Sequence, residues 1–438
     1  MDTLVYRMEM YGDATPARYE FDAVIGHANA IELPPHGVGH KSSWLSRVLV
    51  AILLIAVASL KLVSWHDTPT PYPSAPAFCA KTAKIRSTAD ITPTEALAAA
   101  INSYNALQAC FGGPMDSFRG PYAGLASAWP ESQALAAMIY LSGVSKPSGT
   151  VTDSIEQNIS ILNNYWDPKG GYFPNGRWFA KGVGVKKFDD NAWLGMDLAN
   201  AYLLTRDPVY LNKAEAVAKF EATGWSSNRA FAFPGGIFWQ EPKYGHHRNA
   251  VSTAGAALLN AQLFAITGTG LYRNRAEKYL HWTVTALTLK NGLIGDQISA
   301  NGVVSRNIWS YNQGLVIATY TSLYKTTKNP AYLAAAGLLA EHSLRYFGTG
   351  SHLERQPPVF DAIYLRSLAE LYAVAPNPDY LHALQSYATY LYQRMVPSTG
   401  VIRQGPMANS STGWLLTQAA ATQVFTIYAT VAGHSVRA

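Results

Sequence analysis

A chain of 438 residues is long enough for two or three average domains, or for one large helical barrel. Because 48% of its residues are hydrophobic and only 14% are charged, the composition indicates a folded body with a sizeable core and excludes a disordered chain. The net charge of +6 comes from scattered lysines and arginines, so there is no basic stripe and nucleic acid is excluded as a partner.

The apolar segment WLSRVLVAILLIAVASLKLVSW, residues 44–65, predicts a single transmembrane helix. A helix of 22 residues rises about 33 Å, enough to cross a bilayer if the flanking cations reach the headgroups. A cleaved signal peptide is the alternative. Residues 1–43 precede the segment as a flexible polar tail, and this position favours an uncleaved anchor. Residues 66–89 follow as a linker rich in Pro and Ser.

The chain has two cysteines, Cys79 and Cys110, and both follow the predicted anchor. If that side of the membrane is oxidising, they can form a disulfide. Two buried thiols are the alternative, and the sequence alone does not choose between them.

Residues 90–435 are predicted to form one all-α domain, because helical periodicity continues almost throughout and strand-like alternation is scarce. Thr92, Pro93 and Glu95 make a capping box at its first helix. Twelve helices are expected to start near Pro93, Glu131, Asp153, Asp189, Val209, His247, Leu271, Arg306, Ala331, Val359, Asp379 and Thr412. Six antiparallel pairs can close into an (α/α)6 barrel, and an open superhelical array of the same hairpins is the structural alternative.

A repeated turn supports the pairing of helices. AYLLTRDPVYLNKA, LYKTTKNPAYLAAA and LYAVAPNPDYLHAL share a Tyr, a short turn with Asp-Pro or Asn-Pro, and a Tyr-Leu, and AITGTGLYRNRA is a degenerate copy. The second Tyr of each unit is Tyr210, Tyr272, Tyr332 or Tyr380. Each turn is expected to end one helix and to cap the next, with proline at the first helical position.

The stretch KKFDDNAW, residues 186–193, places Asp189 and Asp190 at the start of a predicted helix. One interpretation is structural, since Asp near a helix N-terminus satisfies orphan amides and complements the helix dipole. The other is catalytic, because adjacent carboxylates can be held about 5 Å apart, the separation that retaining glycosidases use for a nucleophile and an acid. Like-charge repulsion would then raise the pKa of one member of the pair.

Flat aromatic and amide side chains also fall in predicted loops and helix starts. Sugars have apolar ring faces edged with hydroxyls, so such residues suit a glycan cleft, although each aromatic alone is more often a core residue. The candidates for substrate binding are Trp129, Trp193, Trp239, Tyr311, Asn312 and Gln313. The adjacent His246 and His247 lack a third spaced ligand, and no nucleotide-binding glycine loop is present, so neither a metal nor another cofactor is expected.

Taken together, these motifs resemble glycoside hydrolase family 76, the endo-α-1,6-mannanases. The resemblance covers roughly residues 90–430. Its ordered motifs are FDDNAWLGMDLANAYLLT (188–205), GGIFWQ (235–240), RNAVSTAGAALLNAQLF (248–264), YNQG (311–314), FDAIYLR (360–366) and LLTQAAATQVF (415–425). Leu194 stands where the family often has a second Trp, and the family's early Trp-Trp becomes Ala128-Trp129, at positions that help to shape the sugar subsites.

The resemblance implies an (α/α)6 barrel that cleaves internal α-1,6-mannosidic linkages with retention of configuration. It assigns Asp189 as nucleophile and Asp190 as acid/base, and Arg366 of FDAIYLR joins the substrate-binding candidates. It also implies that the barrel is extracytoplasmic and that residues 1–43 are cytoplasmic. We expect a monomer, tethered to the membrane, whose partner is an α-mannan-like polysaccharide.

Three alternatives stay open at this point. The glycosyl-enzyme can be intercepted by a sugar instead of water, which would give transglycosylation. A catalytically silent barrel could bind wall glycan as a tethered module. Another helical-barrel glycosidase could act on a different sugar.

Overall fold

The computed structural model describes residues 77–80, 89–113, 117–119, 125–144, 149–177, 180–241, 247–349, 351–402 and 411–435. The chain divides into two units, Met1–Thr70 and Pro71–Ala438, and the described residues all belong to the second. The predicted tail (1–43) and anchor (44–65) lie outside the described residues, as does most of the predicted linker (66–89).

Twelve α-helices make up most of the described part of the chain. They are α2 (Pro93–Phe111), α3 (Ala128–Ser142), α4 (Gly149–Ile161), α5 (Phe188–Thr205), α6 (Pro208–Thr223), α7 (Ala250–Thr267), α8 (Gly270–Leu287), α9 (Ser310–Thr327), α10 (Pro330–Phe347), α11 (Pro358–Tyr372), α12 (Pro378–Tyr392) and α13 (Ser411–Ser435). The expected number of helices is confirmed, and each expected start lies within a few residues of the observed one.

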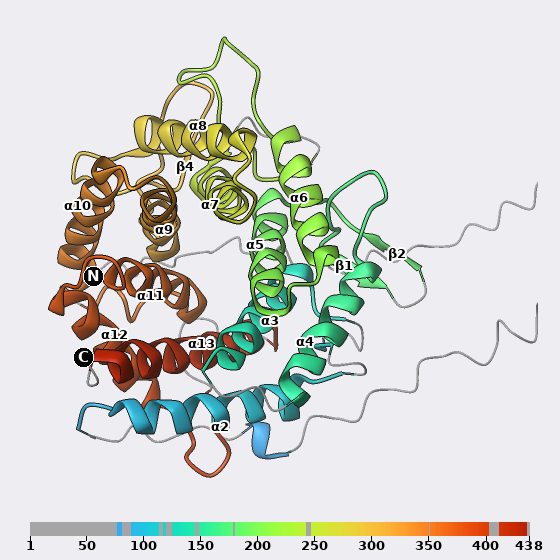
Figure 1. The fold of residues 1–438 in the computed structure, drawn as a ribbon, viewed down its shortest axis with the longest axis vertical. Coiled ribbons are helices and arrows are strands. Elements are labelled where there is room, and N and C mark those ends of the chain that lie inside the picture. Colours follow the sequence, from blue (N-terminus) through green and yellow to red (C-terminus); the bar gives the residue numbers. More distant parts are fainter. Residues whose placement is uncertain are drawn as a thin grey trace, which may run out of the picture. The chain divides into compact units, whose positions relative to one another are not determined.

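The odd-numbered helices form a closed inner ring. Each of α3, α5, α7, α9 and α11 contacts the next odd-numbered helix, and α13 contacts both α11 and α3. The even-numbered helices lie outside this ring (Figure 1). Gln423 of α13 donates a hydrogen bond to the backbone oxygen of Gln133 in α3 (3.0 Å), across the seam between the last and the first inner helix. The structure is therefore a closed ring of six helical pairs rather than an open array.

Inner and outer helices differ in how much of their surface is buried. Every residue of α7 from Ala250 to Ala261 is buried, whereas α6 buries a single stripe that includes Tyr210, Ala214, Val217 and Ala218. A one-sided stripe at steps of three and four is typical of a helix packed on one neighbour. Among the described helices, α7 alone is long and apolar enough to cross a membrane, but it is 72% buried inside the protein and serves as a core helix.

The repeated turns have the predicted form. Asp207, Asn329 and Asn377 cap α6, α10 and α12 by accepting hydrogen bonds from backbone amides two residues ahead, and a proline follows each. The four repeat tyrosines all occupy the third position of an outer helix: Tyr210, Tyr272, Tyr332 and Tyr380.

Cys79 and Cys110 form a disulfide, with their Cα atoms 5.8 Å apart. The sequence left open a disulfide or two buried thiols, and the structure has the disulfide. The bond ties the short 3-10 helix η1 (Ala77–Ala80) to the last turn of α2, so the end of the predicted linker is joined covalently to the barrel.

The connections between helices are short at one end of the ring and long at the other. Only two residues join α5 to α6, α7 to α8, and α9 to α10, whereas the connections that lead into α5, α7 and α9 include 22 or more residues each. Those long connections contain the small sheets β1 (Asn175–Arg177) with β2 (Ala180–Val183) and β3 (Arg248–Asn249) with β4 (Gln297–Ile298). The N-termini of the inner helices lie at the long-loop end, and so does the acidic pair.

Candidate active site

The acidic pair occupies the first turn of α5. The helix begins at Phe188, so Asp189 and Asp190 are its second and third residues, and Lys187 at the N-cap makes no side-chain cap bond. Phe188 is fully buried and stacks on Phe220 of α6 (ring centroids 4.9 Å apart), which fixes the start of the helix. Asp190 is 2% exposed, and Asp189 is partly exposed. Both carboxylates lie in the first turn beside the N-cap, where they complement the helix dipole as the structural interpretation expects, and this position is also compatible with the catalytic one.

A strand-like pairing brings Trp239 onto Asp189. The amide of Phe188 donates to the backbone oxygen of Trp239 (2.9 Å), and Lys187 pairs antiparallel with Gln240. In this arrangement the indole Nε1 of Trp239 donates to Asp189 Oδ2 at 3.0 Å. The contact joins residues from two of the motifs, FDD and GGIFWQ.

Burial raises the pKa of Asp189 to about 6. The Trp239 indole, backbone amides at the helix start and the positive charge of Lys187 all oppose that rise, because they favour the charged form. Asp189 is therefore mostly ionised at pH 7, and it gains a proton below about pH 6.

A third carboxyl group, Glu221 of α6, lies close enough to interact with the pair. It is 0% exposed, and neither of its side-chain oxygens has a hydrogen-bond partner among the residues that the structure describes. Burial raises its pKa well above the usual value, and the charges of Asp189 and Asp190 raise it further. Glu221 is not among the residues predicted from the sequence. Its signal was a Glu within the apolar stripe of α6, one position after Phe220.

Aromatic rings connect four inner helices at their N-terminal ends. The centroids of Trp129 (α3) and Trp193 (α5) are 5.5 Å apart, and those of Trp193 and Tyr311 (α9) are 6.4 Å apart. Tyr311 in turn stacks on Phe360 of α11 at 4.0 Å. Burial, together with the charges of Asp296 and Asp189, raises the pKa of Tyr311 well above its usual value, so this aromatic row passes close to the acidic pair.

Comparison with known proteins decides the family. The family model described as glycosyl hydrolase family 76 matches residues 90–393, more than half of the chain. The chain belongs to glycosyl hydrolase family 76.

Two proteins of similar sequence are named mannan endo-1,6-alpha-mannosidase DCW1. The protein from Saccharomyces cerevisiae is 30% identical over 130 residues, which is 28% of this chain and 28% of the relative. The protein from Candida glabrata is 26% identical over 186 residues, 37% of this chain and 41% of the relative. The matched segments thus span less than half of either relative.

Solved structures in family 76 share the fold. An inactive variant of the alpha-1,6-mannanase GH76A of Salegentibacter sp., bound to alpha-1,6-mannotriose, superposes with a TM-score of 0.64 at 20% identity. The superposition covers 77% of this chain and 99% of that one. The expected helical barrel is confirmed at this level.

The two amide residues of the YNQG motif, Asn312 and Gln313, are both fully buried. Gln313 binds the backbone of the loop before α9: its Oε1 accepts from Ile294 N (2.8 Å), and its Nε2 donates to Ile294 O (2.9 Å) and Trp309 O (3.1 Å). Both ends of this amide are thus already bonded to the chain. Asn312 is fully buried, and neither polar atom of its side-chain amide has a hydrogen-bond partner among the described residues. The Gln313 amide therefore orders the loop next to Tyr311.

Arg366 lies away from the acidic pair. It is 7% exposed, its guanidinium lies 5.4 Å from the ring centroid of Tyr140, and its charged neighbours are Asp197 and Glu370. Asp197 follows Asp189 by eight residues on the same helix, a rise of about 12 Å. The structure therefore brings together Asp189, Asp190, Trp129, Trp193, Trp239 and Tyr311, and it does not bring Arg366 to them.

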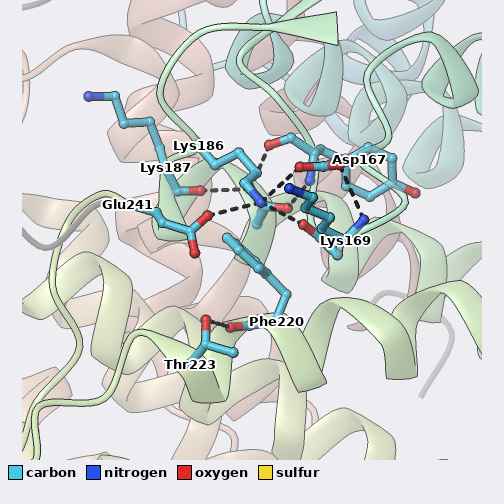
Figure 2. Close-up of polar contacts among 10 residues, drawn as sticks. Asp167, Lys169, Lys186, Lys187, Phe220, Thr223 and Glu241 are labelled. Atoms are coloured by element: carbon cyan, nitrogen blue, oxygen red, sulfur yellow. Dashed lines mark hydrogen bonds and ion pairs between the residues drawn. The ribbon is translucent and has the colours of Figure 1, made fainter. Parts of the chain in front are cut away.

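Lys186, the residue that begins the motif, is a buried structural cation. Its Nζ forms ion pairs with Asp167 (3.3 Å) and Glu241 (2.9 Å), donates to Gly170 O (2.8 Å), and lies 4.8 Å from the Phe220 ring centroid. Figure 2 shows these partners converging on Lys186 from three segments. This cluster fixes the segment between β2 and α5. Within the described residues, no group of three or more His, Cys, Asp or Glu side chains could hold a metal ion.

Proposed function

We propose that this family 76 protein hydrolyses internal α-1,6-mannosidic linkages of a mannan or mannose-rich glycan, with retention of configuration. The observation that carries the proposal is the pair Asp189 and Asp190 in the first turn of an inner helix, with the Trp239 indole bonded to Asp189. Two relatives named mannan endo-1,6-alpha-mannosidase support the linkage. The alpha-1,6-mannanase of similar fold also supports the catalytic pair, since its inactive variant carries asparagines at two consecutive aspartate positions.

In the proposed reaction, Asp189 is the nucleophile and Asp190 the acid/base. The Asp189 carboxylate attacks the anomeric carbon while Asp190 gives its proton to the departing glycosidic oxygen, and a glycosyl-enzyme ester forms. Asp190, now ionised, takes a proton from water, and the resulting hydroxide displaces Asp189 from the sugar. Two displacements at the same carbon restore the original configuration. The Trp239 bond and the Lys187 charge support the assignment of Asp189, because both favour its ionised form.

The proposed substrate contacts come from the aromatic row. Trp129, Trp193 and Tyr311 lie at the long-loop end of the ring, and flat rings can pack against the apolar faces of successive sugars. Interception of the ester by a sugar hydroxyl in place of water would give transglycosylation, which we include in the proposal as a second outcome.

We further propose that the barrel works outside the cytoplasm as a monomer, tethered by residues 44–65. The disulfide between Cys79 and Cys110 supports this location, since disulfides persist mainly in oxidising compartments. Protease added to intact expressing cells would release the barrel if the proposed location is correct and would leave it bound if the location is wrong.

The test of function uses the purified full chain on a panel of linear polysaccharides that includes α-1,6-mannan, β-1,4-mannan and α-1,6-glucan. We expect short oligosaccharides from α-1,6-mannan alone, released first as the α-anomer by proton NMR. Asp190→Asn should abolish release while it keeps binding. Binding of mannan without any product from the wild type would instead identify a catalytically silent module. Product from another polymer would identify a different glycosidase.

A further inference from the structure

Lys187 lies against the indole ring of Trp239, whose nitrogen donates a hydrogen bond to Asp189. The family motifs assign no role to this lysine. We propose that Lys187 is a positioning residue that holds the Trp239 indole on Asp189 and supplies the positive charge that keeps Asp189 ionised. Its effect on catalysis depends on the function proposed above, whereas its effect on Asp189 itself does not.

The geometry of Lys187 differs from that of an ordinary surface lysine. Its Nζ lies 3.7 Å from the ring centroid of Trp239 and donates a hydrogen bond to Gln240 Oε1. The antiparallel pairing of Lys187 with Gln240 fixes the two backbones, so the ammonium is held over the indole face while the indole nitrogen points at Asp189 Oδ2. The Lys187 ammonium therefore lies over the face of the Trp239 ring, while the nitrogen at the edge of that ring donates the hydrogen bond to Asp189.

The charge of Lys187 acts in a place where solvent screens it poorly. Lys187 is half-buried, and a cation on an indole face is worth more when it is partly desolvated. Burial lowers the pKa of Lys187, and the charges of Asp189 and Asp190 oppose that change, so the ammonium and both carboxylates interact. An opposite charge at such range favours the ionised carboxylate.

The adjacent lysine cannot replace it. The ammonium of Lys186 is shared between Asp167 and Glu241, and Figure 2 shows the side chain of Lys187 directed away from that cluster. The two lysines of the motif therefore have separate tasks: Lys186 fixes the segment between β2 and α5, and Lys187 acts on Asp189.

Other ionisable groups also lie around Asp189. Asp190 follows it on α5, Glu221 faces the pair from α6, and Tyr311 faces it from α9, with Asp296 next to Tyr311. Each of these groups is either anionic or neutral. Lys187 is the cation whose charge opposes the raised pKa of Asp189.

The first experiment follows Asp189 through the fluorescence of Trp239 in the full-length protein, so it needs no substrate. Indole emission is measured from pH 4 to pH 8, and the signal of Trp239 is the difference between the wild type and Trp239→Phe. We expect a wild-type transition near pH 6. Lys187→Met should move the transition upward by about one pH unit, and Lys187→Arg should restore most of the shift.

A matched control is available elsewhere in the barrel. Lys278 places its Nζ 4.1 Å from the ring centroid of Trp225, the same kind of contact at a different site. Lys278→Met should leave the Trp239 transition unchanged. If Lys187→Met also leaves the midpoint unchanged, or if Lys187→Arg behaves like Lys187→Met, the proposal is overturned.

Activity provides the second readout. With α-1,6-mannan as substrate, Lys187→Met should lower kcat roughly tenfold at pH 5.5 and much less at pH 8, where Asp189 is ionised in both proteins. A uniform loss across the pH range would indicate a merely structural lysine and would contradict the proposal. An enzyme inactive on every glycan, with the fluorescence shift still present, would overturn the proposed function and leave the role of Lys187 intact.

Discussion

The indole nitrogen of Trp239 lies 3.0 Å from Asp189 Oδ2, although the two residues are 50 positions apart in the chain. The bond exists because Lys187, just before α5, pairs with Gln240 of GGIFWQ in an isolated antiparallel bridge. Two family motifs that look independent in the sequence therefore form one unit at the carboxylate assigned as nucleophile.

Replacing Trp239 with Phe should impair catalysis mainly at low pH. The indole bond favours ionised Asp189, so its loss should raise the pKa of Asp189 above about 6 and move the acid limb of the kcat/KM profile to higher pH. We expect a loss of about tenfold to a hundredfold at pH 6. The pH profile of mannan hydrolysis checks this. An acid limb that stays in place would show that the bond does not control the charge of Asp189.

The roles of the two aspartates can be separated with the leaving group. Asp189→Asn should lose activity on every substrate by roughly a thousandfold or more, because no ester can form. Asp190→Ala should lose as much on mannan but far less on an aryl mannoside whose phenolate leaves without a proton. Steady-state rates on both substrates provide the measurement. Equal losses for both variants on both substrates would contradict the assignment.

Glu221→Gln should change how stability depends on pH. The pKa of Glu221 is raised by burial, so the folded protein keeps a proton that the unfolded chain releases above about pH 4.5. The wild type therefore loses stability as pH rises, by up to about 1.4 kcal/mol per pH unit until the folded-state pKa is reached. Urea unfolding at pH 5, 6 and 7 should show a smaller decline in the Gln variant. Parallel declines would show that Glu221 is not held protonated.

Arg248 should be necessary for the loop that leads to Trp239. Its guanidinium is fully buried and donates to the backbone oxygens of Ala232, Phe233, Gly235 and Ser299. A lysine cannot reach four carbonyls in this planar arrangement, so Arg248→Lys should lower the free energy of unfolding by about 2–4 kcal/mol. Arg273→Lys, at an exposed pair with Glu277, is the control and should cost less than about 0.5 kcal/mol. Urea unfolding of both variants measures these free energies, and equal losses in the two variants would contradict the prediction.

The sequence predicted those parts of the structure that depend on local patterns. The capping box at Thr92 and the proline turns before α6, α10 and α12 are short-range signals, and the structure has them where expected. The closed ring also followed from the number of helical segments. Such features are set by chemistry within a few residues of chain.

Contacts between distant loops were not predictable in the same way. Nothing in KKFDDNAW shows that Lys187 lies on Trp239, because that contact depends on a pairing 50 or more residues away. Gln313 was expected to face a sugar, but its amide binds the backbone at Ile294 instead. The distance of Arg366 from the acidic pair could have been predicted. Arg366 is the ninth residue of α11, so it lies more than two turns from the helix start.

The closure of the ring also affects when the protein can fold. Helix α2, the first of the barrel, packs on α13, the last, and Gln418 Nε2 donates to the backbone and hydroxyl oxygens of Ser103 across 315 positions. A ribosome must synthesise the chain as far as α13 before these partners can meet. The barrel can therefore be completed only after α13 has left the ribosome, and until then the surface of α2 that packs on α13 stays exposed to chaperones.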